Sequence, residues 1–148
     1  MNDKSSFKEQ LSHHSLSIIS LLVAIVALTY NTWRTDTTET NRNLRTASFE
    51  LIRELGKLQN TTNQLHYAQS QNAALTQEQF IQGWGHVALI EDLSALLPQD
   101  IESQALDLKT QWQTHHQQLG QQQNAETQIS LAISNTRQKV RALLHSLE

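Results

Sequence analysis

Residues 16–30 read LSIISLLVAIVALTY, and this run decides the architecture of the chain. It lies within 24 residues, 10–33, that contain no Asp, Glu, Lys or Arg. An α-helix rises about 1.5 Å per residue, so roughly 20 residues cross the hydrocarbon core of a bilayer. Tyr30 and Trp33 then fall at the headgroup level, which amphipathic rings favour. The run predicts a single transmembrane helix over residues 16–33.

Two other interpretations of this run stay open at the level of sequence. A cleaved signal peptide would use Lys4 and Lys8 as its positive region, but the nearest small residues, Ala-Leu-Thr at 27–29, form a poor cleavage site. A buried helix of a water-soluble protein would need cover on all sides, because the run has no polar stripe. We expect an uncleaved anchor preceded by a short polar tail, residues 1–15.

The charges that flank the run are nearly balanced. Lys4 and Lys8 precede it, whereas Arg34, Arg42 and Arg45 follow it, and the Lys and Arg count is what sets topology. A short tail ahead of a first apolar segment resembles an ordinary signal anchor. On that ground we expect a single-pass protein of the cell membrane, with its C-terminal part outside the cytoplasm, in the periplasm.

The composition is polar but weakly charged. The 148 residues include 19 Gln, 14 Thr, 13 Ser and 9 Asn, and the formal net charge is −3. This charge gives no basic footprint for nucleic acid. The absence of Cys excludes a disulfide scaffold, a thiolate metal site and a Cys nucleophile. With only one Pro and four Gly, a turn-rich β-sandwich is disfavoured, so we expect an all-α chain.

Beyond residue 43 the chain carries apolar stripes with alternating spacings of three and four residues, as in coiled coils. The first runs through Leu44, Ser48, Leu51, Leu55, Leu58, Thr62 and Leu65, widened by Phe49 and Ile52. The second runs through Ile101, Ala105, Leu108, Trp112, His115 and Leu119, and the third through Ile129, Ala132 or Ile133, Thr136, Val140, Leu143 and Leu147. Such stripes must be covered by other helices. They predict an antiparallel bundle of about four helices over residues 44–148, with residues 34–43 as a joint or a solvated length of one long helix.

Residues 76–97 are the most apolar part of this region, and we expect their helix at the centre of the bundle. Thr76 begins a capping-box pattern that ends at Gln79, and Pro98 should stop the helix. Asp100 and Asn124 are expected as N-caps of the next two helices. Gly120 is expected in a left-handed C-terminal cap.

Gly83-Trp84-Gly85 is the most unusual local feature, because each Gly within a helix costs about 1 kcal/mol relative to Ala. It predicts either a close approach of a neighbouring helix, with Trp84 as a core plug, or a recess that receives a ligand or partner side chain. Trp112 and His115 on a later helix are further contact candidates. We expect His115 on the inner stripe and His116 facing water.

No pattern predicts a metal, a cofactor or catalysis. No two His residues lie three or four positions apart, the spacing that places two ligands on one ion. There is no phosphate-binding Gly loop, GxSxG motif or Rossmann fingerprint. Glu50, Arg53 and Glu54 are expected on an outward face, as are Glu91 and Asp92. Arg137, Lys139 and Arg141 could contact an acidic partner.

These features favour a non-enzymatic, membrane-anchored helical bundle. It would act through protein contact as an accessory or scaffold subunit, with a protein partner or as a homo-oligomer. The alternative is an extracytoplasmic ligand- or stress-sensing domain, whose architecture would resemble the four-helix sensor domains of bacterial chemoreceptors and kinases. Such a domain would signal through a partner. An enzyme with an unrecognised site is the third hypothesis.

Overall fold

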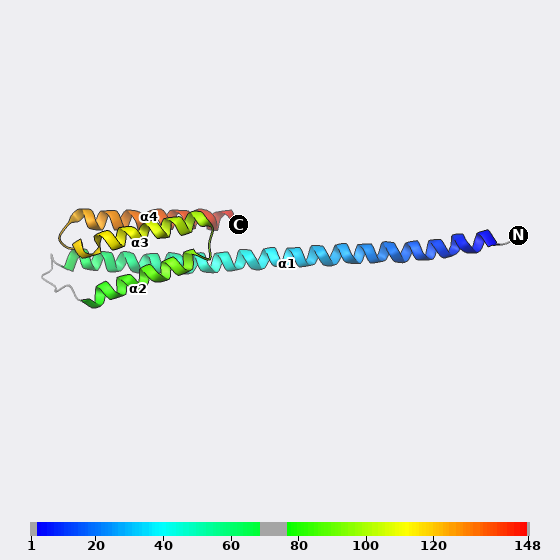
Figure 1. The fold of residues 1–148 in the computed structure, drawn as a ribbon, viewed down its shortest axis with the longest axis horizontal. Coiled ribbons are helices and arrows are strands. Elements are labelled where there is room, and N and C mark those ends of the chain that lie inside the picture. Colours follow the sequence, from blue (N-terminus) through cyan, green and yellow to red (C-terminus); the bar gives the residue numbers. More distant parts are fainter. Residues whose placement is uncertain (1–2, 69–76, 148) are drawn as a thin grey trace. The chain divides into compact units, whose positions relative to one another are not determined.

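The structure is a computed structural model that describes residues 3–68 and 77–147, except for the side chains of residues 3–14 and 16. These residues form helices α1 (Asp3–Ala68), α2 (Gln77–Ser94), α3 (Gln99–His115) and α4 (Gln123–Ser146), with a short 3-10 helix, η2 (His116–Gln118), after α3 (Figure 1). No strand occurs among the described residues, so the all-α prediction is confirmed. By its contacts the chain divides into two units, Met1–Asn41 and Arg42–Glu148.

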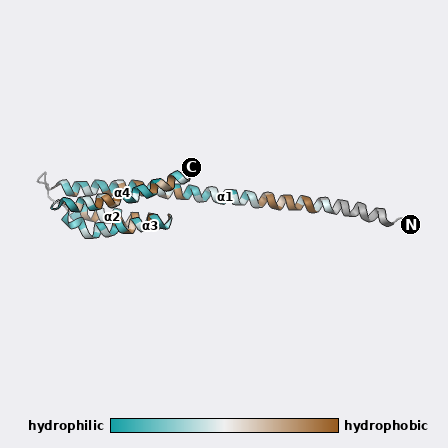
Figure 2. Ribbon diagram, turned by 90° about the horizontal axis from the view of Figure 1, so that it is seen from above, coloured by the Kyte–Doolittle hydropathy of each residue, from teal (hydrophilic) through white to brown (hydrophobic). Residues whose placement is uncertain are grey.

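The first unit contains the apolar run of α1, which is brown in Figure 2. Each large apolar side chain between Ile18 and Leu28 is 51–69% exposed, so nothing in the described chain covers this length of helix. The alternative in which this run is a helix buried by the rest of the described chain is therefore wrong. By length and composition, α1 is long and apolar enough to cross a membrane.

The Thr-rich segment 34–43 is helical throughout, although Thr is a poor helix former. Its hydroxyl groups bond to the carbonyl groups one turn earlier. Thr35 Oγ1 donates to the Asn31 carbonyl at 2.9 Å, and Thr38 Oγ1 donates to the Arg34 carbonyl at 2.8 Å. These hydroxyls are satisfied within their own helix, which needs no neighbour to form.

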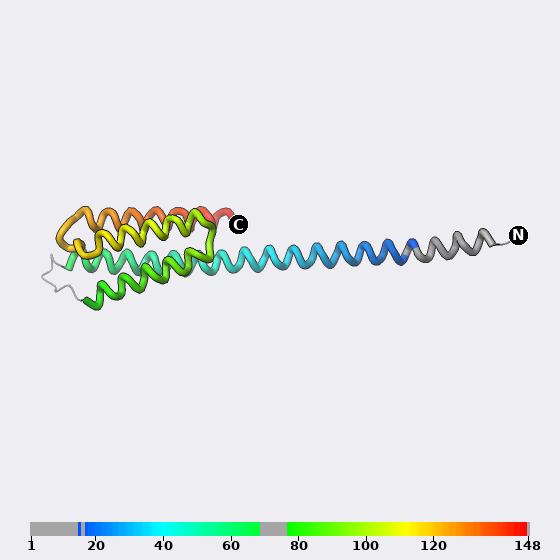
Figure 3. Tube along the Cα trace, viewed as in Figure 1, coloured from blue at the N-terminus to red at the C-terminus, as the bar shows by residue number. Residues whose placement is uncertain are grey.

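The second unit is a four-helix bundle built from α1 beyond Arg42 together with α2, α3 and α4. Hydrogen bonds and ion pairs that involve side chains join each helix to the next. Glu54 and His86 join α1 to α2, and Glu91 and Lys109 join α2 to α3. Thr136 on α4 bonds to Gln104 on α3, and Ser130 on α4 bonds to Gln59 on α1. The connections after α2 and after α3 lie at opposite ends of the bundle (Figure 3). Successive helices are therefore antiparallel, as predicted.

The core follows the predicted stripes. The members of the first stripe from Ser48 to Leu65 are fully buried, and so are most members of the other two. Ala132 and Ile133 both face the core, and Trp112 is its largest fully buried side chain. Phe49 is 59% exposed, so the prediction that it widens the first stripe is wrong. It lies about 100° around the helix from Ser48, toward solvent.

Helix α2 is not at the centre of the bundle, contrary to the prediction. Its buried residues form one narrow stripe, Gly83, Val87, Ile90 and Ser94. Ile81, Leu89 and Leu96 point away from the core and are 63%, 43% and 65% exposed. Apolar residues occur on several sides of α2, and its overall apolar content therefore did not indicate how deeply it is buried.

The helix ends correct two further predictions. Pro98, not Asp100, occupies the N-cap of α3, and Gln122, not Asn124, occupies that of α4; neither makes a side-chain capping bond. The Pro98 carbonyl accepts from the Ile101 amide at 2.9 Å, so the proline begins α3. It does not end α2, which ends at Ser94 and not at the predicted residue 97. Gly120 has a φ of 87°, which confirms its left-handed conformation. The predicted capping box at Thr76 lies outside the described residues.

Candidate functional site

Gly83 and Trp112 bring α2 and α3 into close contact. A Cβ atom on Gly83 would overlap the Trp112 indole at Cζ2 and Cη2 and would lie 3.2 Å from Cε2. The close approach predicted for the Gly-Trp-Gly sequence is thus confirmed at Gly83. A Cβ atom on Gly85 would meet nothing within 4 Å, so that glycine is not required by packing in this unit.

Aromatic rings surround this contact. The His116 ring stacks on Trp112, with 5.7 Å between ring centroids and 20° between planes. It also meets the edges of Trp84 at 5.4 Å and Phe80 at 6.0 Å. The prediction that His116 faces water is wrong, because α3 ends at His115 and the 3-10 turn of η2 directs the next ring inward. Trp84 is only half-buried, and Trp112 takes the place of the core plug.

Some ring nitrogens of this aromatic cluster are hydrogen-bonded and others are not. His116 Nδ1 lies 2.9 Å from the Trp112 carbonyl, and because a carbonyl only accepts, Nδ1 carries the hydrogen. Buried Trp112 Nε1 and His115 Nδ1 have no partner among the described residues. His115 is half-buried at the edge of the inner stripe. The predicted contact residues Gly83, Trp84 and Trp112 therefore meet at one joint between α2 and α3, with His116 as the member that sequence reasoning misplaced.

A second polar cluster links α1 to α2 around Glu54. The Glu54 side chain is 5% exposed; Lys57 Nζ lies 2.6 Å from Oε1, and His86 Nδ1 lies 2.9 Å from Oε2. Burial raises the pKa of Glu54, but the hydrogen bonds and positive charge of Lys57 and His86 outweigh it, so the pKa lies below its ordinary value. The prediction of an outward Glu54 is wrong. Glu50 and Arg53 do form an exposed pair, at 3.2 Å.

A polar pocket of about 220 Å³ lies beside this cluster, between α1 and α2. Its lining residues all carry polar side chains: Lys57, Asn60, Thr61, Gln64, Gln82 and His86. Thr61 is 3% exposed, and within the described chain its hydroxyl has no hydrogen-bond partner. The lining residues of α1 have the spacing of one helix face, which can be recognised in the sequence. The sequence does not indicate that Gln82 and His86 of α2 lie opposite them.

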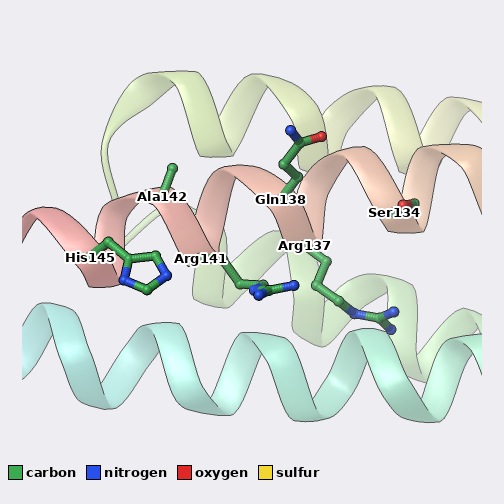
Figure 4. Close-up of a pocket in the computed structure, with 6 residues that line it drawn as sticks. All are labelled: Ser134, Arg137, Gln138, Arg141, Ala142 and His145. Carbon is green, nitrogen blue, oxygen red and sulfur yellow. The ribbon is translucent and has the colours of Figure 1, made fainter.

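The outer face of α4 carries a row of basic side chains (Figure 4). Ser134, Arg137, Arg141 and His145 line a shallow, open groove of about 540 Å³. Among the described residues, Arg137 and Arg141 form no ion pair, whereas Lys139 pairs with Asp100 on α3 at 3.5 Å. The three cations singled out from the sequence therefore do not act on one face.

Among the side chains that the structure describes, in residues 15, 17–68 and 77–147, no cluster of three or more His, Asp or Glu could hold a metal ion. Comparisons with protein-family models, with curated proteins and with solved structures find no match for this chain. Function must therefore be inferred from the geometry and chemistry of the two units.

Proposed function

We propose that the chain is a non-enzymatic, single-pass membrane protein whose helical bundle works by contact with another protein. The exposed apolar run of α1 is the observation that carries this proposal. Eight large apolar side chains between Ile18 and Leu28 stand in solvent, each more than half exposed. Burying one such side chain fully is worth about 1.5–3 kcal/mol, so this helix requires a non-aqueous surrounding. A bilayer provides it for a length with no charge between residues 10 and 33.

The exposed face of α2 supports the proposed protein contact. Ile81 and Leu89 lie near one side of the helix, together with exposed Ala88 and the open Cα of Gly85, and exposed Leu96 follows in the turn after Ser94. From Ile81 to Leu89 this apolar face of α2 extends over about 12 Å at 1.5 Å per residue. Small residues between larger apolar ones allow a second helix to approach closely. The face therefore suits an amphipathic helix of a partner or a second copy of the chain.

The proposed orientation places the bundle outside the cytoplasm, in the periplasm. The flanking Lys and Arg residues are nearly balanced, so this orientation depends on a direct test of topology. Reporter fusions at residue 5 and after the last residue test it, using one reporter active only in the cytoplasm and one active only outside. A cytoplasmic signal from the C-terminal fusion would reverse the orientation and leave the anchor itself in place.

The anchor is tested by carbonate extraction and ultracentrifugation of membranes. We expect the wild-type chain in the pellet. Leu22→Arg with Val26→Arg should move it to the supernatant, because two arginines at the centre of a spanning helix cost roughly 5–7 kcal/mol. Leu106→Arg with Leu131→Arg is the matched control, since both side chains are exposed on the bundle. Wild-type protein in the supernatant would refute the proposed anchor.

The polar pocket between α1 and α2 favours a second candidate function, the sensing of a small ligand. The observation specific to it is Thr61, a buried residue that lines the pocket and whose hydroxyl makes no hydrogen bond within the described chain. In this case, ligand binding would bias the packing of α2 against α1, and a partner protein would receive the signal. Direct measurement of ligand binding tests this candidate.

A further inference from the structure

We infer that the pocket between α1 and α2 binds a small, uncharged, polyhydroxylated molecule of about monosaccharide size. This inference rests on the second candidate function, ligand sensing, and is independent of the anchor and of the exposed face of α2. The inference combines three properties of the pocket: its size, its charge balance and its unsatisfied hydrogen-bonding groups.

The size of the pocket indicates a small ligand. Its volume is about 220 Å³, which corresponds to about seven water molecules at liquid density. Pockets for drug-sized ligands span about 300–1,000 Å³. Both walls are helical: Lys57, Asn60 or Thr61, and Gln64 recur on one face of α1, while Gln82 and His86 lie one turn apart on α2. A compact molecule fits between these two walls.

The charge balance of the pocket favours an uncharged ligand. Lys57 and His86 are its two basic members, and both already contact the buried carboxylate of Glu54, at 2.6 and 2.9 Å. Because a carboxylate only accepts, His86 Nδ1 must donate to it. Glu54, whose pKa is lowered, thus carries the negative charge that balances Lys57, and it accepts a hydrogen bond from His86. An anionic ligand would have to compete with Glu54 for the same donors.

The remaining lining groups both donate and accept hydrogen bonds. Asn60, Gln64 and Gln82 each present an amide with two N–H donors and one carbonyl acceptor, and none of them is bonded within the described chain. Thr61, a residue only 3% exposed, also lines the pocket, and its hydroxyl makes no hydrogen bond within the described chain. Hydroxyl groups of a ligand also donate and accept, so a molecule rich in hydroxyls satisfies this lining, whereas an apolar one leaves it unsatisfied.

Nuclear magnetic resonance of the full chain in lipid nanodiscs, free of sugar-headed detergent, tests the inference. The side-chain amide signals of Asn60, Gln64 and Gln82, assigned by single substitution, report directly on the pocket. Sorbitol, myo-inositol, D-glucose and D-galactose are the neutral probes, and gluconate and glucosamine are six-carbon analogues that carry a charge. We expect at least one neutral probe, at millimolar concentration, to shift all three amide signals and to bind more tightly than either charged analogue.

Two variants connect that binding to the pocket. Thr61→Val keeps the volume of the side chain and removes the unpartnered hydroxyl, so the dissociation constant should rise at least about fivefold. Thr110→Val is the matched control, because Thr110 is exposed on α3 and bonds its own helix, and it should leave binding unchanged. Gln82→Ala, at an exposed position, provides the same test if Thr61→Val does not fold.

Two results would overturn the inference. The first is the absence of amide shifts with every neutral probe, or shifts that persist unchanged in both pocket variants. The second is tighter binding of gluconate or of glucosamine than of any neutral probe, which would assign the pocket to an anion or to a cation. Either failure is distinct from failure of the anchor, because membrane pelleting of the same preparation measures the anchor separately.

Discussion

Gly83 and Gly85 form a matched pair in which the same substitution should have opposite effects. In Gly83→Ala the new Cβ atom would overlap the indole of Trp112, a side chain that is fully buried and stacked on His116. In Gly85→Ala the new atom meets nothing within 4 Å. Both positions lie within α2 and gain the same helix propensity.

The expected magnitudes follow from these contacts. Replacing Gly with Ala in a helix stabilises by about 0.5–1 kcal/mol, and this is the whole effect expected for Gly85→Ala. Gly83→Ala has the same gain but incurs overpacking, which costs about 1–3 kcal/mol and approaches the upper end when the neighbour cannot move. The two variants should therefore differ by about 2–3 kcal/mol in the free energy of unfolding, with the wild type between them.

Chemical denaturation of the full chain in micelles, followed by far-ultraviolet circular dichroism, measures this difference. The near-ultraviolet signal of the tryptophans should change in Gly83→Ala and remain native-like in Gly85→Ala. Trp112→Phe should relieve part of the penalty at Gly83, so that the double variant is more stable than the sum of the single effects. Equal or greater stability of Gly83→Ala with an unchanged tryptophan signal would refute the proposed contact.

Three further predictions concern burial and exposure in the bundle. Glu54→Gln should lower stability by about 1–3 kcal/mol at neutral pH. Because the pKa of Glu54 is lowered in the folded chain, its contribution to the free energy of unfolding is present above pH 4.5 and is lost as the pH falls through the folded pKa. Acid titration followed by circular dichroism should therefore show the difference in stability between wild type and variant disappearing at low pH. Leu55→Ala should cost about 2–5 kcal/mol and Phe49→Ala under about 0.5 kcal/mol in urea denaturation, and equal losses would contradict their assigned burial. Leu89→Lys should abolish copurification of a stoichiometric partner, or self-association, in mild detergent while Leu131→Lys should not; identical behaviour of the two would exclude the α2 face as the contact.

Helix number and the core stripes could be predicted because alternating spacings of three and four residues depend only on helix geometry. Leu51, Leu55 and Trp112 were identified in this way. Burial of Glu54 could not be predicted, because it depends on the pairing of α1 with α2, and His86 is 32 positions away in the sequence. The direction of the His116 ring depends on a single 3-10 turn that apolar periodicity does not encode.

The pocket residues show the same limit at the candidate site. Lys57, Thr61 and Gln64 follow the spacing of one helix face, but polar residues on a face normally indicate solvent. Only the register of the two helices places Gln82 and His86 opposite them. In the aromatic cluster between α2 and α3, a close helix contact could be predicted from the cost of two glycines within a helix. Which of Gly83 and Gly85 makes that contact depends on the position of Trp112.

The self-bonded hydroxyls of α1 have a consequence for the proposed anchor. Thr29 and Thr32 each donate to a carbonyl one turn earlier, as do Thr35, Thr37 and Thr38 beyond Trp33. A hydroxyl that is already engaged loses little on leaving water, so Thr29 and Thr32 add little to the cost of placing this end of the apolar run in a bilayer, whereas Arg34 and Asp36 keep the next turn outside it. The position of the helix along the bilayer normal would then be set by Tyr30 and Trp33, whose ring centroids lie 6.2 Å apart and which favour the headgroup level.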